Sequence, residues 1–252
     1  MQLYHRESGE GKPLVILHGL FGSSDNWLSI GKVLSEHYKV YLVDQRNHGQ
    51  STHSDEFSYP VMANDLLEFI QQHNISDPHI LGHSMGGKTA MQFAVNHTDL
   101  WDRLIVVDIG PKAYPVHHRT ILDGLLSIDL GVVSSRSEAD KQLAEYVPEI
   151  GVRQFLLKNL ARNEAGFRWK INLEAINRHI ETIGDGLEEK QAIQKDVLFI
   201  RGSRSDYIKD EDMGFIKTIF PNANLKTVEN AGHWVHAEKP EELLKLVIEF
   251  LN

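Results

Sequence analysis

Short apolar runs alternate with helical patterns along most of the chain. The runs lie between polar or glycine-rich segments and are rich in Val, Ile and Leu, which is typical of buried parallel strands. Between residues 62 and 70, and again between 243 and 251, apolar side chains recur at the spacing of one helix face. This alternation predicts a doubly wound, mostly parallel sheet, in which functional sites lie at the carboxyl ends of the strands. The predicted strands span 14–19, 39–44, 78–81, 102–110 and 196–202, and a shorter, alternating pattern predicts another strand over 225–230.

One segment interrupts this alternation. From Pro111 to about Lys190 the sequence contains only helical stretches, such as 138–147 and 151–161, and no strand pattern. The chain has no internal repeat, low-complexity tract or linker that would separate a second domain. We therefore expect one domain over residues 1–252, in which residues 111–190 form a helical cap over the strand ends.

Composition narrows the possible functions. The 252 residues include no cysteine, which excludes disulfides, a thiol nucleophile and cysteine-ligated metals and is consistent with a cytoplasmic protein. Thirty-five acidic against 26 basic side chains give a net charge of −9, which argues against a nucleic-acid partner. The 14 histidines form no ligand pattern, so we expect no metal. The polar N-terminus and the lack of a long apolar stretch predict neither a secretory signal nor a membrane partner.

The stretch HILGHSMGG, residues 79–87, contains Gly-x-Ser-x-Gly centred on Ser84. By chance this pattern occurs in about one chain of this length in ten. Here an apolar run precedes it and a helical pattern follows. In that setting the glycines permit a strained turn that lifts the serine hydroxyl clear of the sheet at a helix N-terminus. The context favours Ser84 as a nucleophile over Ser84 as a simple turn residue.

A serine nucleophile needs a base and an acid that orients the base. The candidate base is His233, on the loop between the last predicted strand and the final helix. His83 adjoins the serine on a turn too tight for contact, and His236 is the second choice. Two aspartates follow later strands, Asp108 and Asp206, and the chain order Ser, Asp, His holds for either.

The negative charge that develops on the substrate needs two N–H donors. One is expected to be the backbone N–H of Met85, directly after Ser84. The other is expected on the loop after the first predicted strand, where we choose Leu20, with Phe21 next.

Five segments, in this order and spacing, resemble the α/β-hydrolase superfamily, and within it the bacterial YbfF-type esterases and their mitochondrial abhydrolase-domain relatives. They are LHGLFGSSDNW, VDQRNHGQS, LGHSMGGKTAM, VVDIGP and GHWVHAEKP. The resemblance implies an eight-stranded sheet, a helical cap between strands 6 and 7, and a Ser–Asp–His triad. In this group the acid follows strand 6, which corresponds to Asp108. Many other members place it after strand 7, which corresponds to Asp206.

Together these features predict a serine hydrolase, with Ser84, His233 and Asp108 as its triad. The resemblance points to small or medium acyl esters or thioesters as substrates and to no cofactor. Two alternatives stay open: the same residues could hydrolyse carbon–carbon bonds, or the scaffold could serve as a ligand-binding receptor without turnover.

Overall fold

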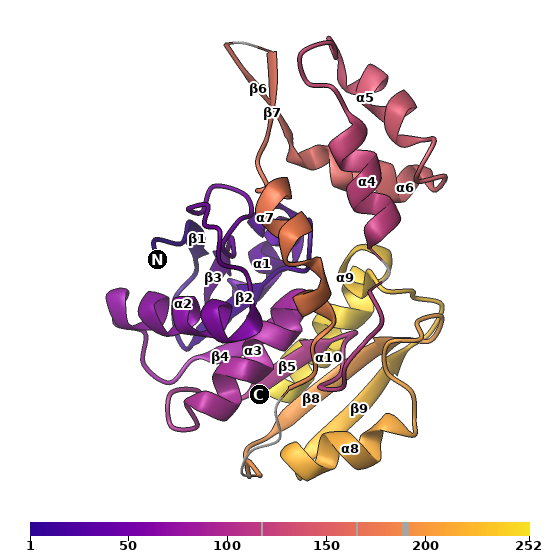
Figure 1. Cartoon of the computed structure of the whole chain (residues 1–252). Helices are drawn as coiled ribbons and strands as arrows, with labels where there is room; N and C mark the ends of the chain where they lie inside the picture. Colours follow the sequence, from indigo (N-terminus) through magenta and orange to yellow (C-terminus); the bar gives the residue numbers. More distant parts are fainter. Residues whose placement is uncertain (117, 165, 188–191) are drawn as a thin grey trace.

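The centre of the molecule is a seven-stranded sheet (Figure 1). The computed structural model describes residues 1–116, 118–164, 166–187 and 192–252. The strand order is β1 (His5–Ser8), β3 (Lys39–Val43), β2 (Pro13–Leu17), β4 (His79–His83), β5 (Leu104–Val107), β8 (Val197–Gly202) and β9 (Ala223–Val228). In this sheet, β1 runs antiparallel to its neighbour β3 and every other pairing is parallel.

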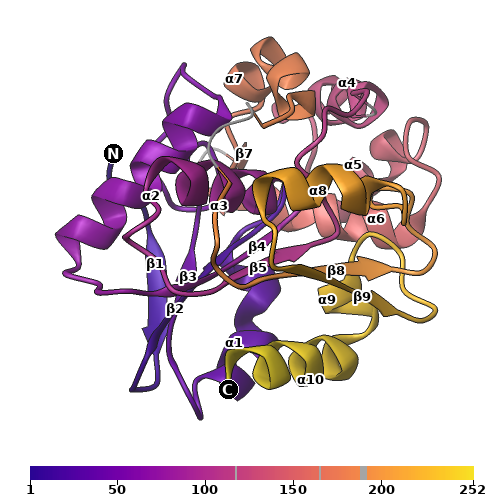
Figure 2. The same cartoon turned by 90° about the horizontal axis from the view of Figure 1, so that it is seen from below.

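Helices cover both faces of the sheet, because alternate residues of each strand point to opposite sides. The helices outside the segment between β5 and β8 are η1 (Ser24–Trp27), α1 (Leu28–Leu34), α2 (Tyr59–Gln72), α3 (Met85–Asn96), α8 (Asp212–Ile219), α9 (Val235–Glu238) and α10 (Pro240–Leu251). In β2, Val15 and Leu17 pack in the core under α2 and α3, whereas Leu14 and Ile16 pack in the core under α1 and α10. Figure 2 shows α2, α3 and α8 on one side of the sheet and α1 and α10 on the other.

Between β5 and β8 the chain leaves the sheet, and we call residues 111–187 the inserted segment. The apolar side chains of the inserted segment form a hydrophobic core that they share with residues of the main body, among them Leu20, Phe21 and Met85. This shared core holds the inserted segment against the loops that follow β2 and β4. Its elements are α4 (Arg119–Ser127), α5 (Arg136–Leu143), α6 (Ile150–Leu156), η2 (Leu157–Asn159), β6 (Leu160–Asn163), β7 (Gly166–Trp169), α7 (Leu173–Arg178) and η3 (Ile180–Gly184).

Two details differ from the sequence-based prediction. The described sheet has seven strands rather than eight, so the inserted segment follows the fifth strand in chain order instead of the sixth. The inserted segment is also not wholly helical, because β6 and β7 form an antiparallel hairpin. Each hairpin strand has only four residues with polar side chains among them, which is too short for an alternating pattern to stand out. No helix in the described part of the chain combines the length and apolar character needed to cross a membrane.

Candidate active site

Ser84 occupies a strained turn between β4 and α3. Its backbone has φ 52° and ψ −119°, in a region that residues other than glycine rarely adopt. Two flanking glycines make the turn possible: a Cβ on Gly82 would lie 2.2 Å from the Gly86 carbonyl oxygen, and one on Gly86 would lie 2.4 Å from the Leu17 carbonyl oxygen. The backbone packing around the motif thus requires glycine on both sides of the serine and leaves the Ser84 side chain lining a pocket.

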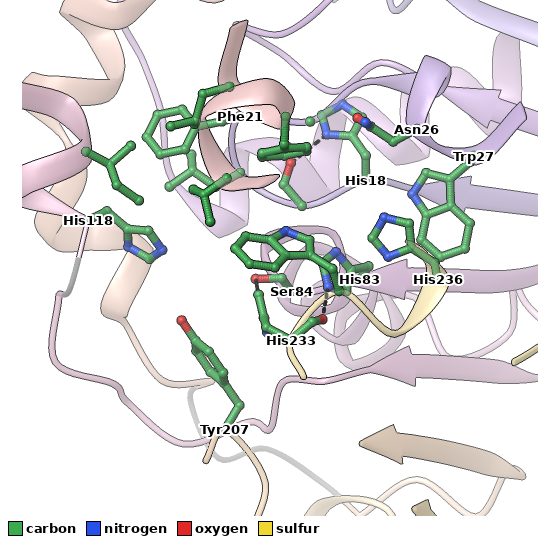
Figure 3. A pocket seen from close by; sticks show the side chains of 18 residues that line it. His18, Phe21, Asn26, Trp27, His83, Ser84, His118, Tyr207, His233 and His236 are labelled. Atoms are coloured by element: carbon green, nitrogen blue, oxygen red, sulfur yellow. Dashed lines mark hydrogen bonds between the residues drawn. The ribbon is translucent and has the colours of Figure 1, made fainter. Parts of the chain in front are cut away.

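Ser84, His233 and Asp108 form one hydrogen-bonded chain. Oγ of Ser84 lies 3.0 Å from Nε2 of His233, and the opposite ring nitrogen, Nδ1, lies 2.8 Å from Oδ2 of Asp108 (Figure 3 shows the serine–histidine pair). The three residues come from the ends of β4 and β5 and from the loop before α9. The fold therefore brings together residues that lie 149 and 125 positions apart in the sequence.

The Asp108 carboxylate is fully buried and accepts three hydrogen bonds. Besides the His233 ring, the Gly202 N–H donates to Oδ1 over 3.0 Å and the Ser205 hydroxyl donates to Oδ2 over 2.5 Å. A buried charge is tolerated only when such partners replace its lost water. These donors hold the carboxylate in one orientation, facing the imidazole.

The His233 ring is fixed from a second direction by Tyr207, whose ring stacks on it at a centroid distance of 4.3 Å and an angle of 26°. The backbone of His233 is held by His83, because Nε2 of His83 lies 2.9 Å from the His233 carbonyl oxygen. Burial, and next the nearby His236, hold the pKa of His83 well below its usual value. His83 therefore supports the candidate base instead of contacting Ser84, as the tight turn predicts.

The alternatives to Asp108 and His233 do not take part in this hydrogen-bonded chain. Asp206 and His233 both line an open pocket of about 370 Å³, but among the described residues no hydrogen bond joins the Asp206 carboxylate to His233, whose Nδ1 faces Asp108 instead. The ring of His236 stacks on Trp27 at 4.5 Å and 13°, and burial lowers its pKa to about 3. Within the described chain it makes no hydrogen bond to Ser84.

The orientation of the Gly19–Leu20 peptide bears on the expected oxyanion donors. The Gly19 carbonyl oxygen lies 2.8 Å from Nδ1 of His18 and also accepts from the Gly22 N–H over 2.9 Å. In a trans peptide the N–H points away from the C=O, so the Leu20 N–H points away from His18. The alternative donor, the Phe21 N–H, is directed to Nε2 of His48 over 3.2 Å.

Two buried histidines therefore shape this loop. His48 lies with Nδ1 2.8 Å from the Arg46 carbonyl oxygen, and Nε2 of His18 accepts from the Gln45 N–H over 3.0 Å. Burial is the main cause that lowers the pKa of His18 to about 4 and that of His48 to about 3. Both rings are thus neutral near pH 7, with Nδ1 as donor and Nε2 as acceptor.

Sequence reasoning missed three residues of this arrangement: Ser205, Tyr207 and His48. Ser205 and Tyr207 flank Asp206, which drew attention to their segment for a different reason. His48 lies in the segment DQRNHGQS, whose glycine and asparagine indicate a turn but not its contact with the loop after β2. The positive φ of Asn47 and Gly49 confirms the turn itself.

A pocket of about 260 Å³ opens above Ser84 between the main body and the inserted segment (Figure 3). The inserted segment supplies one wall from α4 and α6, and the loops after β2 and β9 supply the others. Just over half of its side chains are apolar or aromatic, and the polar ones are Asn26, Ser84 and five histidines: His18, His83, His118, His233 and His236. The residues from the inserted segment are His118, Ile121, Val152, Phe155 and Leu156.

Comparison with known proteins agrees with this architecture. A family model described as the alpha/beta hydrolase fold matches residues 12–148. The chain belongs to the α/β-hydrolase-fold family. It is 39% identical over 250 residues to the sn-1-specific diacylglycerol lipase ABHD11 of Xenopus laevis, covering 96% of this chain and 80% of that protein.

For two further relatives, the matched region covers almost the whole of this chain and almost the whole of the relative. Esterase YbfF of Escherichia coli is 34% identical over 241 residues, which are 95% of this chain and 93% of that protein. The structure of a marine microorganism esterase superposes with a TM-score of 0.97 at 46% identity and covers 99% of each chain. The chain is a hydrolase of this esterase and lipase group.

Proposed function

We propose that this α/β-hydrolase cleaves carboxylic esters or thioesters through an acyl-enzyme, with Ser84 as nucleophile, His233 as general base and Asp108 as the orienting acid. The observation that carries the proposal is the hydrogen-bonded chain from Ser84 through His233 to Asp108, in which Ser84 and His233 line the pocket. A serine hydroxyl becomes an effective nucleophile when a base can take its proton within hydrogen-bond reach.

In the first half-reaction, Oγ of Ser84 attacks the substrate carbonyl carbon while Nε2 of His233 takes the hydroxyl proton. The carbonyl π electrons move to the oxygen, which the N–H groups of Leu20 and Met85 stabilise. Met85 begins α3, so its N–H is one of the groups that lack an intrahelical partner. The intermediate then collapses, and His233 returns the proton to the departing alcohol or thiol.

In the second half-reaction, water replaces the leaving group. Nε2 of His233 removes a proton from the water as it attacks the acyl carbon, and the proton passes to Oγ of Ser84 when the acid departs. Asp108 keeps Nδ1 of His233 protonated, so that Nε2 faces the serine in both halves. These steps use only side chains, backbone groups and water.

The pocket suggests the substrate class. Its volume of about 260 Å³ and its apolar walls suit a small or medium acyl or alcohol group, and the inserted segment serves as the cap that closes it. Relatives named as an esterase and as a diacylglycerol lipase support an ester substrate over a carbon–carbon bond. A receptor without turnover is disfavoured by the strained Ser84 backbone, since such strain is retained mainly where it serves function.

The decisive experiment combines a fluorophosphonate probe with p-nitrophenyl esters of increasing acyl length. We expect the wild type to bind one probe per chain and to hydrolyse the shorter esters. Ser84→Ala should do neither, while Ser137→Ala, at an exposed position on α5, should behave as the wild type. Probe labelling that survives in Ser84→Ala, or ester binding by the wild type without turnover, would refute the proposal.

A further inference from the structure

Lys88 lies in the first turn of α3, four residues after Ser84, and its exposed fraction is 0%. Lysine is almost never fully buried unless its charge is paired. The ammonium is also placed at the positive end of the helix dipole, where a cation is unfavourable. Its hydrogen bonds go to two backbone carbonyl oxygens, of Lys112 over 2.5 Å and of Asp185 over 2.8 Å. Lys88 thus departs from two preferences of lysine, for an exposed side chain and for positions away from a helix N-terminus. Such a departure, close to the candidate nucleophile, points to a functional constraint.

The two carbonyls belong to the two connections between the inserted segment and the main body. We call these connections, residues 110–114 and 183–187, the junction. They also bind each other: the Tyr114 N–H donates to the Gly184 carbonyl over 2.8 Å, and the Leu187 N–H donates to the Pro111 carbonyl over 2.7 Å. Lys88 on α3 thus donates hydrogen bonds to both connections at once.

A chain of contacts leads from this junction to the candidate base. The Lys88 ammonium lies 5.1 Å from the ring centroid of Tyr114. The Tyr114 hydroxyl donates to the Tyr207 carbonyl over 2.6 Å and accepts from the Gly110 N–H over 2.8 Å. The Tyr207 ring in turn stacks on His233. These contacts connect the imidazole of His233 to the junction that Lys88 binds.

We propose that Lys88 is a positioning residue of the hydrolysis proposed above: its Nζ anchors both connections of the inserted segment on α3 and, through Tyr114 and Tyr207, fixes the ring of His233 against Ser84. Burial lowers the pKa of Lys88 to about 7, with Lys112 adding to this effect and Asp185 opposing it. A neutral amine keeps two N–H donors, one for each carbonyl, so the anchor works in both protonation states.

The test compares Lys88→Met, which keeps the length of the side chain but has no donor, with Lys88→Gln, which retains two N–H donors. We expect Lys88→Met to speed amide hydrogen exchange in residues 112–114 and 183–187. It should lower kcat for p-nitrophenyl esters about tenfold and change KM less than about twofold, because the imidazole is misplaced while the pocket remains. Lys88→Gln should recover part of both losses.

Lys195→Met is the matched control, because Lys195 also donates to a backbone carbonyl, that of Trp101, and lies over its indole ring at 4.8 Å. It should leave kcat and exchange at the junction unchanged. Wild-type kcat together with wild-type exchange in Lys88→Met would overturn the proposal.

A second variant keeps the proposal testable if Lys88→Met does not fold. Tyr114→Phe removes only the hydroxyl that holds Tyr207. It should lower kcat without raising exchange in 183–187, and a wild-type kcat would overturn the link to His233. If the wild type itself hydrolyses no ester, the proposed function fails, and the exchange measurement still decides whether Lys88 anchors the junction.

Discussion

Oδ2 of Asp108 lies 2.8 Å from Nδ1 of His233, and the hydroxyl of Ser205 donates to the same oxygen. The chain leaves the sheet at the end of β5, directly before Asp108. Asp108 has a backbone φ of 54°, an unusual angle, and its side chain faces the loop that carries His233. An ionised carboxylate only accepts hydrogen bonds, so it selects the histidine tautomer with a proton on Nδ1. That tautomer leaves the lone pair of Nε2 free to accept a hydrogen bond from the Ser84 hydroxyl.

The first prediction separates the two aspartates. Asp108→Asn places an amide beside Nδ1, which favours the opposite tautomer, and kcat for p-nitrophenyl acetate should fall by about 10³- to 10⁴-fold. Asp206→Asn removes a carboxylate that makes no hydrogen bond to His233 in the described structure, so its kcat should stay within about twofold of the wild type. Steady-state kinetics of the two variants check this. A larger loss in Asp206→Asn would reassign the acid.

The second prediction concerns the loop that carries Leu20. His48→Leu removes the acceptor of the Phe21 N–H, which loosens the loop and should lower kcat about tenfold or more with little change in KM. His48→Gln keeps an acceptor near Nε2 and should retain most of the activity. His37→Leu, at an exposed histidine, is the control. The idea fails if the leucine and glutamine variants of His48 have the same kcat.

The pattern of apolar and polar residues was sufficient to locate six of the seven strands of the central sheet. The pattern missed β1 because this edge strand, with the sequence HRES, is polar and only partly buried. It missed the β6–β7 hairpin because four-residue strands carry too little periodicity. Local sequence therefore predicts five strands by the apolar run that burial on both faces imposes, and it predicts the edge strand β9 by a shorter alternating pattern.

From the sequence pattern, only those residues of the candidate site that lie in a local motif could be predicted. Ser84 and His233 stand out because each lies in a distinctive turn after a strand. The local pattern could not distinguish Asp108 from Asp206, since both follow strands and both fit the chain order, and the choice of Asp108 rested on the family resemblance. Only the three-dimensional structure shows that Asp108 faces the imidazole while the neighbour of Asp206, Ser205, donates to Asp108. Contacts such as these depend on strand order, which the sequence pattern does not encode.

The third prediction tests the close packing around the serine turn. A Cβ on Gly86 would lie 2.4 Å from the Leu17 carbonyl oxygen and 2.6 Å from that of His18, and backbone atoms cannot move aside cheaply. Gly86→Ala should therefore lower the free energy of unfolding by about 3 kcal/mol. Gly214→Ala, inside α8 with nothing within 4 Å of the added Cβ, should raise it by about 0.5–1 kcal/mol. Urea unfolding of both variants gives the comparison, and equal effects would contradict it.

The fourth prediction uses the lowered pKa of Lys88. Burial shifts this pKa from 10.5 to about 7. Below pH 7 the amine is therefore protonated in both the folded and the unfolded chain, and the buried charge lowers the free energy of unfolding by its full desolvation cost. Above pH 7 the folded protein releases the proton while the unfolded chain keeps it until about pH 10.5. The cost therefore decreases as the pH rises, and the free energy of unfolding gains about 1.4 kcal/mol per pH unit from this group.

Lys88→Met lacks this contribution. When urea unfolding is measured at pH 7, 8 and 9, the wild type should gain stability relative to Lys88→Met at each step, approaching about 1.4 kcal/mol per unit. Groups that titrate equally in both proteins cancel in the difference, which isolates Lys88. Parallel curves would show that the folded protein keeps the Lys88 proton throughout this range. The hydrogen bonds to the Lys112 and Asp185 carbonyls would then hold a permanent cation.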